Sequence, residues 1–407
     1  MFDFTTDLLR YADKAERSCS AVFADIDRVC AANSRRVLSA FIDNKVSATH
    51  FKGTSGYGYD DAGREVCDKV YAQVLGCDDA FVRYTFANGT HALATMLFAL
   101  LTRGDDLVVL SGKPYDTLAR VTDKLRGDGV SYAELDCALS GVYDEDACGR
   151  ISRCTAAYIQ RSRGYGTRKS LSADEVNACV ARVRELNPKA IVLVDNCYGE
   201  FVDTVEPDGD IIAGSLIKNI GGGIAQTGGY VAGRKCLVDK IADRLIVPGM
   251  GREVGCFADG VCRDILKGLY FAPSVTASAM KTAVFARALF VLHGYNVYPN
   301  HLTKPADIVT AITLGSPGKL KSFCAAIQGA GAVDSHVAPT PAPMPGYDCD
   351  VIMASPSFTE GSSIEISCDA PFREPYVVYL QGGLTYETGK LAVLNAAAAV
   401  GANTGAD

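Results

Sequence analysis

The sequence predicts an α/β protein whose large domain is built on a mostly parallel sheet. From about residue 81 to residue 233, short apolar runs typical of buried strands alternate with helical patterns, which is the signature of βαβ units. One of these helices is predicted after Ser172, where a capping box with Glu175 precedes apolar residues at helical spacing. The mixed pattern that follows this region predicts a second, smaller α+β domain.

We expect three parts along the chain. Residues 1–50 have apolar residues spaced for one helical face and predict an N-terminal arm that packs on a partner subunit or on the small domain. Residues 51–285 form the predicted large domain and residues 286–407 the small one. The elements predicted within the small domain are a helix at 317–329, a stiff proline-rich surface loop at 338–345, and strands at 350–354 and 363–367.

Composition agrees with a globular protein of the cytoplasm. The 407 residues are 48% hydrophobic and 21% charged, no apolar run reaches the roughly 20 residues that span a bilayer, and the N-terminus lacks the pattern of a secretory signal. A net charge of -7 gives no basic surface for nucleic acid or an anionic membrane. The 15 cysteines are scattered without any Cys-x-x-Cys pair, so we interpret them as small buried hydrophobic residues and expect no metal site.

Polar residues follow three of the predicted strands. Asp195 ends the apolar run 190–194, Lys218 follows the run 211–217, and Asn88 stands between a predicted strand and a predicted helix. Ligands of open α/β sheets bind at the carboxyl ends of the strands. A lysine and a carboxylate at this edge are what pyridoxal phosphate (PLP) requires, because the lysine forms a Schiff base and the carboxylate keeps the ring nitrogen protonated.

The neighbouring residues support a phosphate ligand. Asn88, Gly89 and Thr90 open a predicted helix, whose first N–H groups can face an anion. Glycines at 221–223 and 228–229 let the backbone after Lys218 approach a ligand, and we expect apolar surroundings to lower the pKa of the lysine. Taken singly, each feature has an ordinary alternative: a turn aspartate, a solvated lysine or a simple N-cap.

The chain resembles the fold-type I PLP enzymes and, within them, the cystathionine lyase and methionine γ-lyase branch. It is most similar to the methionine γ-lyase-like group often labelled aluminium resistance protein. The segments that carry the resemblance are 52–60, 87–92, 111–118, 194–201 and 215–219. The resemblance implies the PLP-dependent transferase-like fold, with a mostly parallel sheet in the large domain and a smaller α+β C-terminal domain.

The resemblance also implies roles for individual residues. Lys218 would hold PLP, Asp195 would pair with the ring nitrogen, and Tyr115 would stack on the ring. His91 is a competing ring contact. The residues implied to surround the phosphate are Asn88, Gly89, Thr90 and Ser215.

Three further residues have expected roles outside this group. Tyr57 and Tyr59 have counterparts that reach the phosphate of a neighbouring subunit, which implies a homo-oligomer, a dimer or a tetramer, with a shared site. The alternative is a flexible Gly-Tyr loop without a ligand. Arg373 is our candidate for the substrate α-carboxylate, because a guanidinium matches a carboxylate with two hydrogen bonds; the alternative is a surface salt bridge.

The expected activity is that of a PLP-dependent carbon–sulfur lyase on a sulfur amino acid of the cystathionine, cysteine or methionine class. The chain departs from the lyases at two positions. Asp116 stands where methionine γ-lyases have a cysteine, which bears on γ-elimination of methionine. Ile217 precedes the lysine where the lyases have a threonine, so one hydroxyl contact to the phosphate is missing. The alternatives are an aminotransferase or racemase, which use the same cofactor chemistry, and a non-catalytic metal-tolerance protein.

Overall fold

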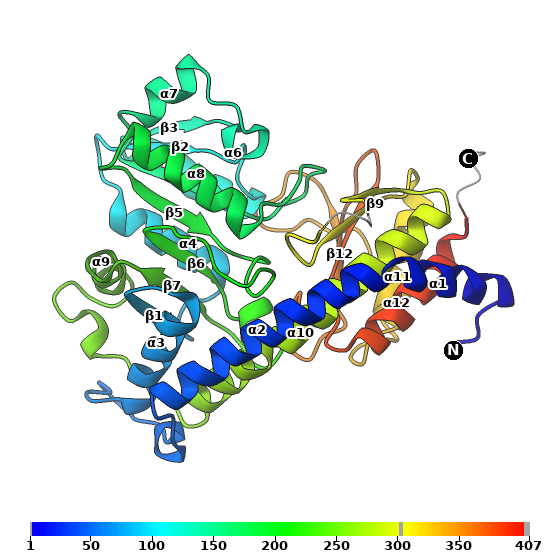
Figure 1. The fold of residues 1–407 in the computed structure, drawn as a ribbon, viewed down its shortest axis with the longest axis horizontal. Coiled ribbons are helices and arrows are strands. Elements are labelled where there is room, and N and C mark those ends of the chain that lie inside the picture. The colour runs from blue at the N-terminus through cyan, green and yellow to red at the C-terminus, as the bar shows by residue number, and fades with distance from the viewer. Residues whose placement is uncertain (1, 301–303, 403–407) are drawn as a thin grey trace.

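The computed structural model describes residues 2–300 and 304–402, which contain two β-sheets joined by long helices (Figure 1). Helix α2 (Ser20–Asp43) lies along helix α10 (Val261–Leu292), and the pair runs from the large sheet to the small one. Helix α10 passes through residue 285, where we expected the boundary between the two domains.

The large sheet has seven strands in the order β1-β7-β6-β5-β4-β2-β3. Strands β2, β3, β4, β5 and β6 run parallel to one another. Strand β7 runs antiparallel to its two neighbours, β6 and β1. The predicted mostly parallel sheet is therefore confirmed. The strands are β1 (Asp79–Arg83), β2 (Asp106–Val109), β3 (Ser131–Glu134), β4 (Ala156–Gln160), β5 (Ile191–Asp195), β6 (Ile211–Ser215) and β7 (Gly229–Gly233).

Helices cover both faces of this sheet. Along β5, Val192 and Val194 belong to one hydrophobic cluster and Leu193 to another, because successive side chains of a strand point to opposite faces. The flanking helices are α3 (Ala62–Leu75), α4 (Gly89–Leu100), α5 (Ala119–Gly127), α6 (Cys137–Ser140), α7 (Glu145–Ile151), α8 (Ala173–Leu186) and α9 (Lys235–Leu245). Short 3-10 turns are η1 (Ala48–Phe51), η2 (Asp116–Leu118), η3 (Asn219–Gly221) and η4 (Gly251–Glu253).

The predicted capping box at the start of α8 is confirmed. The Ser172 hydroxyl accepts a hydrogen bond from the Glu175 amide at 3.2 Å, and the Glu175 carboxylate accepts one from the Ser172 amide at 2.9 Å. This reciprocal pair satisfies two N–H groups that a helix start leaves without partners.

The small sheet is wholly antiparallel, in the order β10-β11-β12-β9-β8. Its strands are β8 (Asn296–Tyr298), β9 (Thr310–Thr313), β10 (Val351–Ala354), β11 (Ser367–Pro371) and β12 (Val377–Gln381), and its helices are α11 (Pro317–Gly329) and α12 (Tyr386–Val400). The strand predicted at 363–367 is wrong, because residues 363–366 form turns around Glu365. The Glu365 carboxylate accepts hydrogen bonds from the amides of Phe358 and Thr359 at 2.7 and 2.9 Å.

The N-terminal helices pack on the small sheet's side of the molecule as well as on α10. In α1 (Thr6–Ser18), the Glu16 carboxylate accepts hydrogen bonds from Tyr386 and Lys390 of α12 at 2.7 and 2.6 Å. Helix α10 is long and apolar enough to cross a bilayer, but 72% of its most apolar window is buried inside the protein. Our sequence criterion missed it because it counted unbroken apolar runs, and the burial identifies α10 as a core helix.

Candidate active site

A cavity of about 180 Å³ lies at the carboxyl ends of β5 and β6, next to the start of α4. Seven of the predicted site residues meet there, although they come from positions as far apart as 88 and 218. The lining residues are Asn88, Gly89, Thr90, Leu93, Tyr115, Thr117, Leu118, Ser162, Asp195, Cys197, Tyr198, Ser215, Ile217 and Lys218.

Asp195 is the last residue of β5 and is almost completely buried. Its Oδ1 accepts a hydrogen bond from the Cys197 amide at 3.1 Å, and its Oδ2 accepts one from the Tyr158 hydroxyl at 3.4 Å. Burial raises the pKa of Asp195, while the contacts with Cys197 and the charge of Lys218 lower it, and the net pKa lies above the ordinary value. A buried carboxyl group of this kind is suited to pair with a protonated ring nitrogen.

Lys218 follows β6, and its ammonium lies 3.4 Å from the centre of the Tyr198 ring. This is a close cation–π contact. Burial lowers the pKa of Lys218, but Tyr198, Cys197 and Asp195 raise it, and the net pKa lies above the ordinary value. The expected lowering is therefore wrong, because it considered apolar surroundings without the groups that stabilise the ammonium.

The start of α4 forms one side of the cavity. The Asn88 side chain accepts a hydrogen bond from the His91 amide at 2.8 Å and so caps the helix. A Cβ at Gly89 would lie 2.9 Å from the Ser215 Cβ, so only glycine permits this close approach. The hydroxyls of Thr90 and Thr117 are 2.8 Å apart. Thr117 thus adds a hydroxyl to a cavity in which Ile217 replaces the threonine of the lyases.

Tyr115 stands between the cavity and a group of aromatic side chains. Its amide donates to Gln160 Oε1 at 2.7 Å, and its hydroxyl is hydrogen-bonded to that of Tyr347. The ring of Tyr165 packs edge-on against it at 5.4 Å between centroids. Burial, together with the charge of Asp369, raises the pKa of Tyr115.

Tyr198 is a site residue that our sequence reasoning missed. Its backbone has a φ of +69°, which is strained for a side chain of this size, and Phe201 in the same loop has a φ of +63°. Strain of this kind is concentrated at functional sites. The available signal was its position between the strand-ending Asp195 and Gly199, in a loop that the sheet topology places at the ligand edge.

Glu200, in the same loop, is also fully buried. Its Oε1 accepts a hydrogen bond from the Tyr230 hydroxyl at 2.9 Å, and its Oε2 has no hydrogen-bond partner among the described residues. Burial raises the pKa of Glu200 to about 8, so this side chain is mostly protonated at neutral pH.

Four residues considered in the sequence do not line the cavity. Tyr57 and Tyr59 stack on each other with centroids 5.4 Å apart, and their side chains are 65% and 59% exposed. Arg373 lines a neighbouring cavity and forms an ion pair with Asp348 at 2.9 Å. The His91 ring packs edge-on against Phe86.

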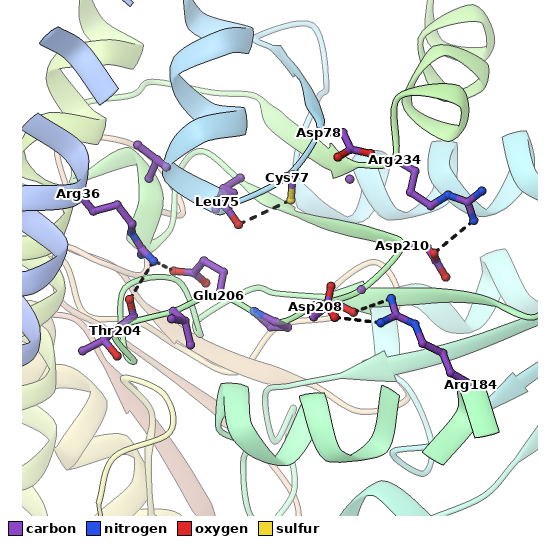
Figure 2. A pocket seen from close by; sticks show the side chains of 16 residues that line it. Arg36, Leu75, Cys77, Asp78, Arg184, Thr204, Glu206, Asp208, Asp210 and Arg234 are labelled. Carbon is purple, nitrogen blue, oxygen red and sulfur yellow. Dashed lines mark hydrogen bonds and ion pairs between the residues drawn. The ribbon is translucent and has the colours of Figure 1, made fainter. Parts of the chain in front are cut away.

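A larger cavity, of about 580 Å³, lies at the opposite end of the large sheet, beside the residues that precede β1 and β6 (Figure 2). Figure 2 shows three arginines around it, each paired with a carboxylate. The pairs are Arg36–Glu206 at 3.2 Å, Arg184–Asp208 at 2.9 Å and Arg234–Asp210 at 3.4 Å. Within residues 2–300 and 304–402, no group of three or more His, Cys, Asp or Glu side chains is placed to hold a metal ion.

Comparisons with known proteins agree with the geometry. A family model described as methionine gamma-lyase matches residues 8–401. The "Uncharacterized protein YnbB" of Bacillus subtilis is 39% identical over 97% of this chain and 98% of its own length.

Solved structures give the same picture. A Listeria monocytogenes protein named "putative cystathionine beta-lyase involved in aluminum resistance" is 40% identical, with a TM-score of 0.92 over 97% of this chain and 100% of its own. A Clostridium novyi protein named "carbon-sulfur lyase involved in aluminum resistance" is 39% identical, with a TM-score of 0.90 over 97% and 96%. A methionine gamma lyase from Micromonospora echinospora, 17% identical with a TM-score of 0.55 over 82% and 87%, shares the fold.

Proposed function

Because the chain belongs to the methionine γ-lyase family, we propose that it is a PLP-dependent carbon–sulfur lyase acting on a sulfur amino acid by β- or γ-elimination. The observation that carries the proposal is the convergence of Lys218, Asp195 and the start of α4 on one cavity of about 180 Å³. When bound, PLP supplies an electron sink for the negative charge that develops on the substrate α-carbon.

The side chains of the cavity fit this cofactor. Lys218 is the amine that would hold its aldehyde, and Asp195 is the buried carboxyl group that would face its ring nitrogen. The phosphate would be bound by the N–H groups at the start of α4 and by nearby hydroxyls. The residues that supply these groups are Asn88, Gly89, Thr90, Ser215 and Thr117.

Two residues are placed to move protons. Lys218, once it is free, would remove the proton from the substrate α-carbon, and the ring of Tyr198 would hold its ammonium form through the cation–π contact. Tyr115 stays protonated because burial raises its pKa, so its hydroxyl could supply a proton to the departing thiolate. Asp116, which replaces the cysteine of the methionine γ-lyases, pairs with Lys113 at 3.4 Å and is not among the residues that line the cavity.

We also propose a homo-oligomer, a dimer or a tetramer, in which Tyr57 and Tyr59 reach the site of a neighbouring subunit. Both rings are exposed and lie outside their own cavity. The test is light scattering together with the PLP affinity of a Tyr57→Phe variant. A monomer that binds PLP as tightly in the variant as in the wild type would contradict this part of the proposal. We expect the protein to work in the cytoplasm.

The activity is tested by loading the purified protein with PLP and adding cystathionine, cysteine or methionine. We expect a visible absorption band before substrate, and pyruvate or 2-oxobutyrate together with a thiol after it. A protein that instead converts an amino acid and a 2-oxo acid without releasing thiol is an aminotransferase, and one that only inverts the α-carbon is a racemase. Full turnover by a Lys218→Ala variant would contradict all three.

A further inference from the structure

A second cavity, of about 280 Å³, adjoins the catalytic one, with Tyr115 lining both. We propose that this second cavity binds a carboxylate carried by the substrate side chain, so that the preferred substrate is a sulfur amino acid with a second carboxylate beyond the sulfur. The identification of the ligand as a substrate rests on the proposed lyase function, whereas the carboxylate site itself does not.

The first observation is an excess of positive charge in the walls. Four cationic side chains line the cavity, against one carboxylate, that of Asp116. The four are Lys113, Arg163, Arg168 and Arg373. Asp116 pairs with Lys113, and Arg373 pairs with Asp348, an exposed residue that is not part of the lining. A surface pair of this kind is weak and exchanges readily for another anion.

The second observation is that Arg168 has no carboxylate partner in the described part of the chain. Its three nitrogens donate instead to the carbonyl oxygens of Ser111, Ser162 at 2.9 Å and Arg163 at 3.2 Å. These bonds fix the guanidinium in place without neutralising it. Burial lowers the pKa of Arg168 and the charge of Asp195 raises it, which places this guanidinium within electrostatic reach of the catalytic cavity.

The third observation concerns two arginines that are buried at or near the wall of the second cavity. The side chain of Arg163 is 1% exposed and is 3.7 Å from Asp307, and its Nη1 has no hydrogen-bond partner among the described residues. The fully buried Arg287 also lies within electrostatic reach of both Arg163 and Asp307. Two buried guanidiniums therefore depend on one carboxylate. Such an uncompensated positive charge favours an anion nearby.

The position of the cavity suits the distal end of a substrate. Gln160 in its wall accepts a hydrogen bond from the Tyr115 amide at 2.7 Å and donates one to the Ser162 carbonyl at 3.0 Å. Ser162 lines the catalytic cavity and Tyr115 lines both, so the end of β4 and the Tyr115 side chain belong to the walls of the two spaces. A third cavity of about 320 Å³ shares Tyr165, Gly166 and Arg373 with the second.

The larger cavity of Figure 2 lacks such an excess of positive charge. Each of its three arginines already has a carboxylate partner. Asp78 adds a fourth carboxylate to the lining, so no positive charge is left over there for an anion, and the size of the cavity alone supports no binding site.

The carboxylate site is tested without turnover by calorimetry on the full chain saturated with PLP, with glutarate as the probe and its neutral diamide as the comparison. We expect glutarate alone to bind, and a Lys113→Gln variant to bind it about threefold to fivefold more weakly, as the loss of one exposed charge predicts. Lys124→Gln is the matched control, because Lys113 and Lys124 are 66% and 62% exposed and both pair with an aspartate. Equal glutarate affinity in the wild type and the Lys113 variant, or no binding at all, overturns the proposal.

Kinetics then separate the two carboxylates of a substrate. S-(2-carboxyethyl)cysteine and its terminal amide differ only in the distal charge, and we expect the acid to have a KM about tenfold lower. An Arg373→Gln variant should raise KM for the acid alone; an equal rise for both compounds assigns Arg373 to the α-carboxylate and removes it from the proposed site. If glutarate binding depends on Lys113 but neither compound is cleaved, the carboxylate site stands and the proposed lyase function is refuted. If both compounds are cleaved with the same KM, the proposed carboxylate site alone is refuted.

Discussion

The two ends of the large sheet differ in how their charges are balanced. At the end away from Lys218, a cavity of about 580 Å³ holds three arginines, each within 3.4 Å of a carboxylate (Figure 2). At the other end, a cavity of about 180 Å³ holds a buried lysine against a tyrosine ring and a buried carboxyl group with a raised pKa. Reactivity requires groups held away from their preferred state, and the smaller cavity combines a buried lysine with a buried carboxyl group, both with shifted pKa values.

Removing the Lys218 amine should have the largest effect on activity. We expect Lys218→Ala to abolish the visible absorption band and to lower turnover by about a thousandfold or more, because the same amine holds the cofactor and moves the α-proton. Absorbance and product formation measure this. A variant that keeps both would move the chemistry away from this end of the sheet.

Asp195→Asn should have the next largest effect. The amide has the same shape as the carboxyl group but cannot hold the charge that keeps a ring nitrogen protonated, so we expect kcat to fall by about a hundredfold while the fold is preserved. Circular dichroism checks the fold and steady-state kinetics check the loss. Unchanged kcat would show that the buried carboxyl group does not face the cofactor.

Glu200→Gln should change how the free energy of unfolding depends on pH. The folded-state pKa of about 8 lies above the ordinary value of 4.5, so the protonated form contributes stability that is complete below pH 4.5 and is lost as the pH rises through 8. Between pH 6 and pH 9, we expect the free energy of unfolding of the wild type to fall by roughly 3 kcal/mol more than that of the variant. Urea unfolding at the two pH values measures the difference, and parallel curves would contradict it.

A substitution at the larger cavity should have the smallest effect on stability and activity. Arg184 and Asp208 form an exposed pair, whose loss in Arg184→Gln should cost about 0–1 kcal/mol of stability and leave kcat/KM within twofold of the wild type. Urea unfolding and kinetics test both. A tenfold loss of activity would show that the larger cavity takes part in function.

Much of the end of the large sheet that carries Lys218 could be predicted from the sequence, because its site residues follow apolar strands. Asp195, Lys218 and Asn88 stand at strand ends in the chain, and a parallel sheet necessarily brings such ends together. Helix α11 was predicted over its full length, and the structure shows its start at Pro317, directly after the capping residue Ser316.

What could not be predicted depends on side-chain contacts that the apolar pattern of the sequence does not reveal. The raised pKa of Lys218 comes from the charges and hydrogen bonds of side chains around it in space, first Tyr198 and then Cys197 and Asp195, and the spacing of residues in the sequence does not give their combined effect. The strand predicted at 363–367 failed because Glu365 bonds two amides six and seven residues before it, a local arrangement that apolar spacing does not reveal. The roles of Tyr57, Tyr59 and Arg373 remain predictions.

The loop that carries Lys218 is anchored from the far half of the polypeptide. The Ser362 hydroxyl donates to the carbonyl of Ile217 at 3.2 Å, and Tyr198 packs against the cluster of Val309, Ala311, Val377 and Tyr379. Every residue that lines the catalytic cavity is encoded before position 219, yet the reactive amine is steadied by segments made last. A ribosome must therefore synthesise the C-terminal sheet before these contacts with the loop of Lys218 and with Tyr198 can form.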